Sequence, residues 1–168
     1  MTGAAEDHQV VIFGLGTESF ALPVAQVREI LDHRTCFRMP HMPAWILGLT
    51  DIRGQSVPVV DLRLRLGMAP VEPTLKTRVL VTEFQPKAEG AGPQRLGLVV
   101  DQVLDVSLYD AGAVESPPAI GGRWRSECVA AILRHKGDFA ALLDLASIFA
   151  EDDPAMLDST ALAGAIAA

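Results

Sequence analysis

Short apolar runs separated by turn-forming residues dominate the first part of the chain. Residues 10–15 and 18–22 flank a Gly-Thr turn, and residues 46–52 and 56–60 flank an Arg-Gly-Gln turn. Apolar runs of this length around a short glycine-containing turn are typical of β-hairpins. The pattern therefore predicts two hairpins, and in the second one Gly54 is free to adopt a positive φ.

Helical spacing is found between these hairpins and after the second one. The aliphatic residues of segment 23–33 (PVAQVREILDH) recur as on one face of a helix, and Pro23 suits a first helical position. Asp61 is placed to cap a short helical turn over residues 62–66, which Gly67 can end. We therefore expect a short amphipathic helix between the hairpins and one helical turn after them.

The second half contains further strand patterns. Residues 77–84 (TRVLVTEF) and 95–101 (RLGLVVD) are apolar on both faces and are joined by a polar, glycine-rich connector. Strands that are apolar on both faces are typical of sheets covered on both sides. We expect small sheets that pack against each other, with surplus apolar side chains available as a protein-binding patch.

The chain also repeats itself. Three segments of the first half resemble three segments of the second half in the same order: 10–15 and 79–84, 22–30 and 98–106, and 53–62 and 136–145. Valine, leucine and aspartate are common here, so chance similarity between apolar strands is the alternative. The repeat predicts a mainly β protein with two units of about five strands each. We expect the first unit over residues 10–70, the second over 77–150, and an acidic, alanine-rich tail over 151–168.

Composition narrows the classes of partner. A net charge of −7 opposes a general attraction to nucleic-acid phosphates, and 5% aromatic residues leave few platforms for base stacking. No basic and apolar leader opens the chain, and no run approaches the roughly 18 apolar residues that span a bilayer. We expect a soluble, cytoplasmic protein without direct membrane insertion.

The sequence offers little for catalysis or metal binding. Cys36 and Cys128 are far apart and form no C-x-x-C pair, and the four histidines have no acidic or thiol neighbour at metal-ligand spacing. No nucleophile motif such as G-x-S-x-G is present. We expect no metal, cofactor or catalytic residue, although a triad assembled from distant residues stays open at this point.

The most specific stretch is TDIRGQSVPVVDL, residues 50–62. Together with Arg63 it resembles the N-L-R-G-x-x-V-P-V-x-D-L-R signature of the CheW family, the coupling proteins of bacterial chemotaxis. Residues 20–30 are similar to the family's Y-x-I-x-x-x-x-V-x-E-I pattern, and residues 96–106 resemble V-G-I-V-V-D-x-V-x-D-V. The resemblance extends from about residue 10 to residue 149.

This resemblance implies a fold and a function. The fold is two SH3-like five-stranded β-barrels packed together, in agreement with the internal repeat. The function is that of a non-catalytic adaptor without cofactors, which links the cytoplasmic tip of chemoreceptors to the regulatory domain of the histidine kinase CheA. The alternative is the same adaptor role in a chemosensory array that controls pilus motility or development.

The resemblance also implies which residues contact the partners. The matched positions are Val27, Glu29, Gly48, Arg53, Gly54, Val103 and Val106. On a hairpin tip, the Arg53 guanidinium can engage a carboxylate or backbone carbonyls of a partner. The two later valines match a receptor-facing groove between the barrels. A solvated turn arginine, a solvated glutamate and ordinary core valines are the alternatives.

Two positions depart from the family pattern. Asp51 replaces the usual asparagine and could pair with Arg53, which would reduce the reach of the guanidinium. Cys128 lies where relatives commonly have an aromatic residue. Both departures bear on the choice of partner more than on the fold.

Overall fold

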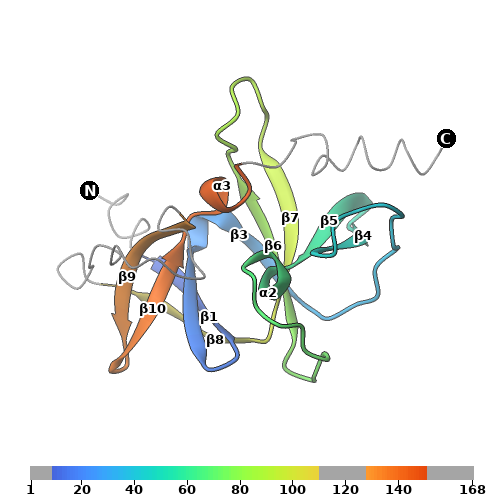
Figure 1. Cartoon of the computed structure of the whole chain (residues 1–168). Helices are drawn as coiled ribbons and strands as arrows, with labels where there is room; N and C mark the ends of the chain where they lie inside the picture. Colours follow the sequence, from blue (N-terminus) through green and yellow to red (C-terminus); the bar gives the residue numbers. More distant parts are fainter. Residues whose placement is uncertain (1–8, 110–127, 151–168) are drawn as a thin grey trace.

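The computed structural model describes residues 9–109 and 128–150, and the strands of these regions form two five-stranded sheets (Figure 1). The strands are β1 (Gln9–Leu15), β2 (Glu18–Pro23), β3 (Val27–Asp32), β4 (Ile46–Ile52), β5 (Gln55–Asp61), β6 (Arg78–Phe84), β7 (Gln94–Val100), β8 (Gln102–Leu108), β9 (Val129–His135) and β10 (Asp138–Leu143). Three short helices accompany them: η1 (Val24–Gln26), α2 (Leu62–Arg65) and α3 (Leu145–Ile148). The prediction of a mainly β fold with two five-stranded units is confirmed.

The two sheets have the same topology. Sheet A has the strand order β8-β1-β2-β10-β9, and sheet B has the order β3-β6-β7-β5-β4. Each strand of sheet B has a counterpart in the other repeat, for example β8 for β3 and β1 for β6. When every strand is replaced by its counterpart, the strand order of sheet B becomes that of sheet A. The parallel pair also recurs, as β10 with β2 in sheet A and as β5 with β7 in sheet B. The internal repeat is therefore a structural duplication.

The sheets do not follow the predicted boundary between residues 70 and 77. Sheet B takes all its strands from β3 to β7, whereas sheet A combines β1 and β2 with β8 to β10. The reason is that the repeats exchange their first two strands: β3 and β5 pair with β6 and β7, whereas β8 and β10 pair with β1 and β2. Each sheet thus holds the first two strands of one repeat and the last three strands of the other. The predicted tail, 151–168, lies outside the described residues.

The helix predicted over residues 23–33 is wrong. Only η1 is helical there, and β3 follows it directly. In β3 the half-buried Val27, Glu29 and Leu31 alternate with exposed residues, a period of two that fits a strand at a sheet edge. Valine and isoleucine favour extended backbone. Pairing with β6 also supplies hydrogen-bond partners for the backbone of β3, and the helical spacing of the apolar residues carries no information about this pairing.

The predicted hairpins and cap are confirmed. β1 pairs with β2, and β4 pairs with β5 through a two-residue turn at Arg53 and Gly54. Both turn residues have positive φ, 52° and 81°, which is typical of the tight turns that match strand twist. The Asp61 side chain accepts a hydrogen bond from the Leu64 amide, so it caps α2 as expected.

One hydrophobic core is shared by both sheets. Its fully buried members include Phe13, Leu15, Phe20 and Leu22 from sheet A, Leu80, Leu96 and Leu98 from sheet B, and Leu62 and Leu145 from the two α-helices. Phe149 stacks on Phe84, and its ring lies 5.9 Å from that of Trp45. Burial of this apolar surface stabilises the sheets jointly, because neither sheet has a separate core of this size.

An ion pair fixes the point where the chain passes from sheet B to sheet A. Asp101 lies between β7 and β8, and its carboxylate accepts hydrogen bonds from Arg63 Nε at 2.8 Å and Nη2 at 2.5 Å. The Gly16 amide, in the turn between β1 and β2, also donates to this carboxylate, at 2.7 Å. The hydrogen bonds from Arg63 lower the pKa of Asp101 below its ordinary 3.8. The pair therefore ties α2, the crossing and sheet A together.

We expect Arg63→Met to lower the free energy of unfolding by about 2 kcal/mol, because it leaves the half-buried carboxylate without its cation. Urea denaturation at pH 7 measures the loss.

Asp101→Asn tests the sign of the pH dependence. Since the folded-state pKa of Asp101 is lowered, its stabilisation is present above pH 3.8 and is lost as the pH falls through the folded value. The wild-type and variant curves should therefore converge at low pH. Arg95→Met, which breaks a more exposed pair with Glu83, is the control and should cost less than about 1 kcal/mol.

Candidate functional site

The tip of the β4–β5 hairpin brings two of the predicted site residues together. Arg53 forms a two-point ion pair with Glu29, with Nε–Oε2 at 3.1 Å and Nη2–Oε1 at 3.4 Å. Glu29 lies on β3, at the opposite end of the strand order of sheet B. Contact between the two ends shows that the sheet curls until its edges approach, as a barrel does.

The ion pair is asymmetric in exposure. The Arg53 side chain is 81% exposed, whereas that of Glu29 is 25% exposed. The hydrogen bond with Glu29 raises the pKa of Arg53, and the guanidinium of an arginine is charged at any physiological pH. Exposed pairs contribute little to stability, so the main effect of Glu29 is to hold the guanidinium in a defined position at the surface.

The second repeat contains a counterpart of this pair. Lys136 and Gly137 form the β9–β10 turn with φ values of 50° and 84°, and Lys136 Nζ lies 3.6 Å from Asp105 Oδ2 on β8. His135 Nε2 lies 3.4 Å from the same oxygen. The sequence alignment of the repeats pairs Arg53 with Lys136 and Glu29 with Asp105. The repeat in the sequence therefore contains the signal for the second pair, which was not predicted.

Asp51 does not take the role that its charge suggested. Arg53 pairs with Glu29 instead, and the Asp51 carbonyl accepts a hydrogen bond from Arg34 Nη1 at 3.3 Å. Cys128 is half-buried, and its carbonyl accepts from the Asp144 amide at 2.9 Å. Its counterpart in the first repeat is Trp45, whose carbonyl accepts from the Asp61 amide at 2.8 Å. The aromatic residue is thus present once in the duplicated structure.

The two predicted site glycines have different surroundings. A Cβ on Gly54 would meet no atom within 4 Å, so Gly54 serves the turn through its positive φ. A Cβ on Gly48 would lie 2.0 Å from the Phe37 carbonyl oxygen, and Gly48 has a φ of 145°. The segment around Phe37 pairs with β4 through two hydrogen bonds to Leu49, of 2.7 and 2.8 Å. Gly48 therefore permits the close approach of this segment to the edge of sheet B.

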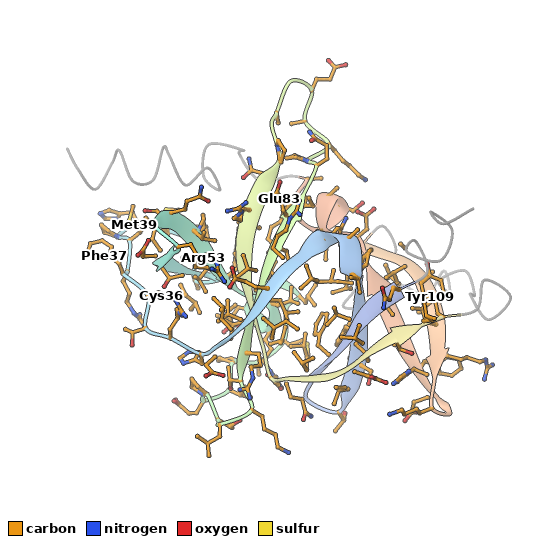
Figure 2. The ribbon with its side chains drawn as sticks, turned by 180° about the vertical axis from the view of Figure 1, so that it is seen from behind. Cys36, Phe37, Met39, Arg53, Glu83 and Tyr109 are labelled. Carbon is orange, nitrogen blue, oxygen red and sulfur yellow. The ribbon has the colours of Figure 1, made fainter. Side chains whose placement is uncertain are left out.

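The predicted valines are divided between the core and the surface. Val27 on β3 and Val103 on β8 are half-buried against the shared core. Val106 is 50% exposed and points to the other side of β8, in a row with Leu104 at 46% and Leu108 at 66%. β8 is the edge strand of sheet A, and Figure 2 shows β3 and β8 crossing the same side of the molecule.

The apolar row on β8 was only partly predicted. Leu104 and Leu108 alternate with polar residues at a period of two, a signal of one exposed strand face that the sequence already contains. The corresponding outward residues of β3 are Arg28, Ile30 and Asp32. Arg28 pairs with Glu83 at 3.3 Å, and Asp32 lies 3.7 Å from Arg78. The two edge strands thus present different chemistry: apolar on β8 and mostly charged on β3.

Within residues 9–109 and 128–150, no three histidine, cysteine, aspartate or glutamate side chains gather in a way that could hold a metal ion. In the same residues, no helix has the length and apolar character that crossing a membrane requires. The exposed groups described above offer charge and apolar area for contacts between proteins.

Comparisons with known proteins agree on one family. A family model described as a CheW-like domain matches residues 9–153. A probable chemotaxis protein CheW of Rhizobium etli is 29% identical over 147 residues, which cover 88% of this chain and 90% of that protein. Protein FrzA of Myxococcus xanthus is 27% identical over 141 residues, covering 83% of this chain and 82% of FrzA. The crystal structure of the scaffolding protein TtCheW from Thermoanaerobacter tengcongensis superposes with a TM-score of 0.75 at 25% identity, covering 87% of this chain and 94% of that one.

We expect Gly48→Ala to lower the free energy of unfolding by more than about 2 kcal/mol, because the new Cβ meets backbone that cannot move aside alone. Gly54→Ala is the matched control. It adds a Cβ in open space at positive φ and should cost only about 1 kcal/mol. Chemical denaturation of both variants decides the point, and equal stabilities would contradict the structural role given to Gly48.

Proposed function

The chain belongs to the CheW-like domain family, and from this premise we propose that it is a non-catalytic adaptor of bacterial chemotaxis signalling. In this role it links chemoreceptors to the histidine kinase CheA without a cofactor. The adaptor contacts the regulatory domain of the kinase and the cytoplasmic tip of the receptor, which places it in the cytoplasm. The family consists of scaffolding proteins rather than enzymes.

The observation that carries the proposal is the apolar row on β8. Leu104, Val106 and Leu108 are each about half exposed or more, on an edge strand whose outer side has no neighbour in sheet A. Exposed apolar rows on sheet edges invite association, so a protein that keeps one has a partner for it. We assign this row, extended by Val103 beneath it, to the receptor.

The hairpin tip provides the second contact. Arg53 is charged, exposed and held by Glu29, so little side-chain entropy is lost when it engages a carboxylate of the kinase. Gly54 shapes the turn that projects it. Gly48 and Val27 support this surface from below, through the β4 edge and the core respectively.

The same adaptor chemistry serves an alternative signalling array equally well. The identity to FrzA, 27%, is only two percentage points below the 29% identity to the Rhizobium etli protein. Sequence similarity therefore supports a flagellar array and one that controls pilus motility or development to a similar degree. The genes flanking this one in its genome distinguish the two.

We expect Val106→Asp to weaken binding to a cognate receptor signalling domain at least about tenfold, because it places a charge within the apolar contact. The melting temperature should change little, since Val106 is half exposed. Val71→Asp is the control, because Val71 is 53% exposed on the loop that follows α2. Calorimetric titration measures both affinities. Equal losses in the two variants would remove β8 from the receptor contact.

We expect Arg53→Ala to weaken binding to the cognate kinase while leaving the melting temperature within a few degrees of wild type, because the ion pair is exposed. Charge reversal at Glu29 should have the same effect, since it removes the group that positions the guanidinium. Lys136→Ala, at the equivalent turn of the second repeat, is the control. A large loss of thermal stability in Arg53→Ala would assign the pair to the fold instead.

A further inference from the structure

Phe37 is an exposed aromatic side chain on a fixed backbone. It is 58% exposed, more than any other phenylalanine of the chain, and lies in the segment between β3 and β4. Its amide donates to the Leu49 carbonyl at 2.7 Å, and its carbonyl accepts from the Leu49 amide at 2.8 Å. Gly48 has no Cβ that would block this approach. The ring is therefore held at the surface by the edge of sheet B, which lowers the entropic cost of burying it in a complex.

Two arginines lie on either side of Phe37 in the sequence. Arg34 and Arg38 are both exposed, and both lie close enough to the Cys36 thiol to oppose the rise in its pKa that burial causes. Residues 33–50 contain no aspartate or glutamate, although the whole chain has 21 acidic and 14 basic residues. An apolar ring between cations, on an otherwise acidic protein, is complementary to an apolar pocket bordered by carboxylates.

This surface is continuous with the hairpin that carries Arg53. The backbone pairing of Phe37 with Leu49 and the hydrogen bond from Arg34 to the Asp51 carbonyl both attach the segment to β4. Figure 2 shows Phe37 and Met39 at the outer rim of the molecule beside this hairpin, far from Tyr109 at the end of β8. The cavity on the inner side of the segment is lined by Arg34 and Arg38 as well as by the paired Arg63 and Asp101, whereas Phe37 is not among its lining residues. The ring of Phe37 therefore points away from the cavity, and the two arginines of the segment are exposed, so they remain open to a partner.

We propose that Phe37 is an anchor of the kinase-binding surface, inserted into an apolar pocket of the kinase whose rim of carboxylates pairs with Arg34 and Arg38. This inference rests on the proposed function and extends its kinase contact from the hairpin tip to the segment before β4. Aromatic and arginine side chains held in place at a surface are the residue types that dominate binding energy at protein interfaces.

The test is calorimetric titration of the full chain with the purified cognate CheA-type kinase, in the absence of receptor. Phe37→Ala should weaken binding at least about tenfold. The double variant Arg34→Glu/Arg38→Glu should weaken it similarly and should flatten its dependence on salt concentration. Phe139→Ala is the matched control, because Phe139 is 53% exposed on β10, in the other sheet, and should bind as wild type does.

The outcomes separate this inference from the function on which it rests. Wild-type affinity in Phe37→Ala, with an unchanged melting temperature, overturns the anchor and leaves the adaptor function in place. If Phe37→Ala loses thermal stability, the double arginine variant decides, and wild-type affinity and salt dependence there overturn the inference. If the wild-type chain itself does not bind the kinase at tens of micromolar, the proposed kinase contact fails and the anchor fails with it.

Discussion

The exchange of the first two strands between the two repeats is the constraint on which the rest of the structure depends. Neither repeat completes a five-stranded sheet alone, because β3 pairs with β6 and β8 pairs with β1. The chain must therefore cross between the sheets after β2 and again after β7. Both crossings are short, so the sheets are held against each other and bury one shared core. The ion pair of Arg63 with Asp101 fixes the second crossing; at the first one, the position equivalent to Asp101 is Ala25, which has no carboxylate.

Barrel closure explains why the same turn carries charge in both repeats. Each sheet curls until the hairpin at one end meets the edge strand at the other, and at that seam a basic turn residue faces an acidic strand residue. The seam pairs are Arg53 with Glu29 and Lys136 with Asp105. Both basic residues have positive φ, as the tight turns that join the two strands of each hairpin require. A residue that closes a barrel in this way is also fixed in space, which is what contact with a partner requires.

The sequence was sufficient for the features that depend on local chemistry. The hairpin turns, the Asp61 cap and the duplicated order of motifs were predictable, because turn residues and capping groups act within a few positions. The Glu29–Arg53 pair was not predictable as a contact, since it joins residues from opposite ends of a sheet. The region of β3 was misjudged because valine, isoleucine and leucine at these positions satisfy both a helical and a strand period, and pairing with β6 decides between them. The exchange of β1 and β2 with β6 and β7 was missed for a related reason: an internal repeat shows which segments are equivalent and says nothing of which partner each one chooses.

An adaptor needs two surfaces that differ, and a duplicated fold begins with two that are alike. The structure shows where the repeats have diverged. On β3 the outward positions carry Arg28 and Asp32, both engaged by opposite charges, whereas the equivalent positions on β8 carry Leu104 and Leu108. Because apolar and charged surfaces select different partners, this divergence gives one small fold two chemically distinct surfaces. The shared core then couples the two surfaces at a fixed geometry, so the adaptor works by setting the relative position of its partners rather than by chemistry of its own.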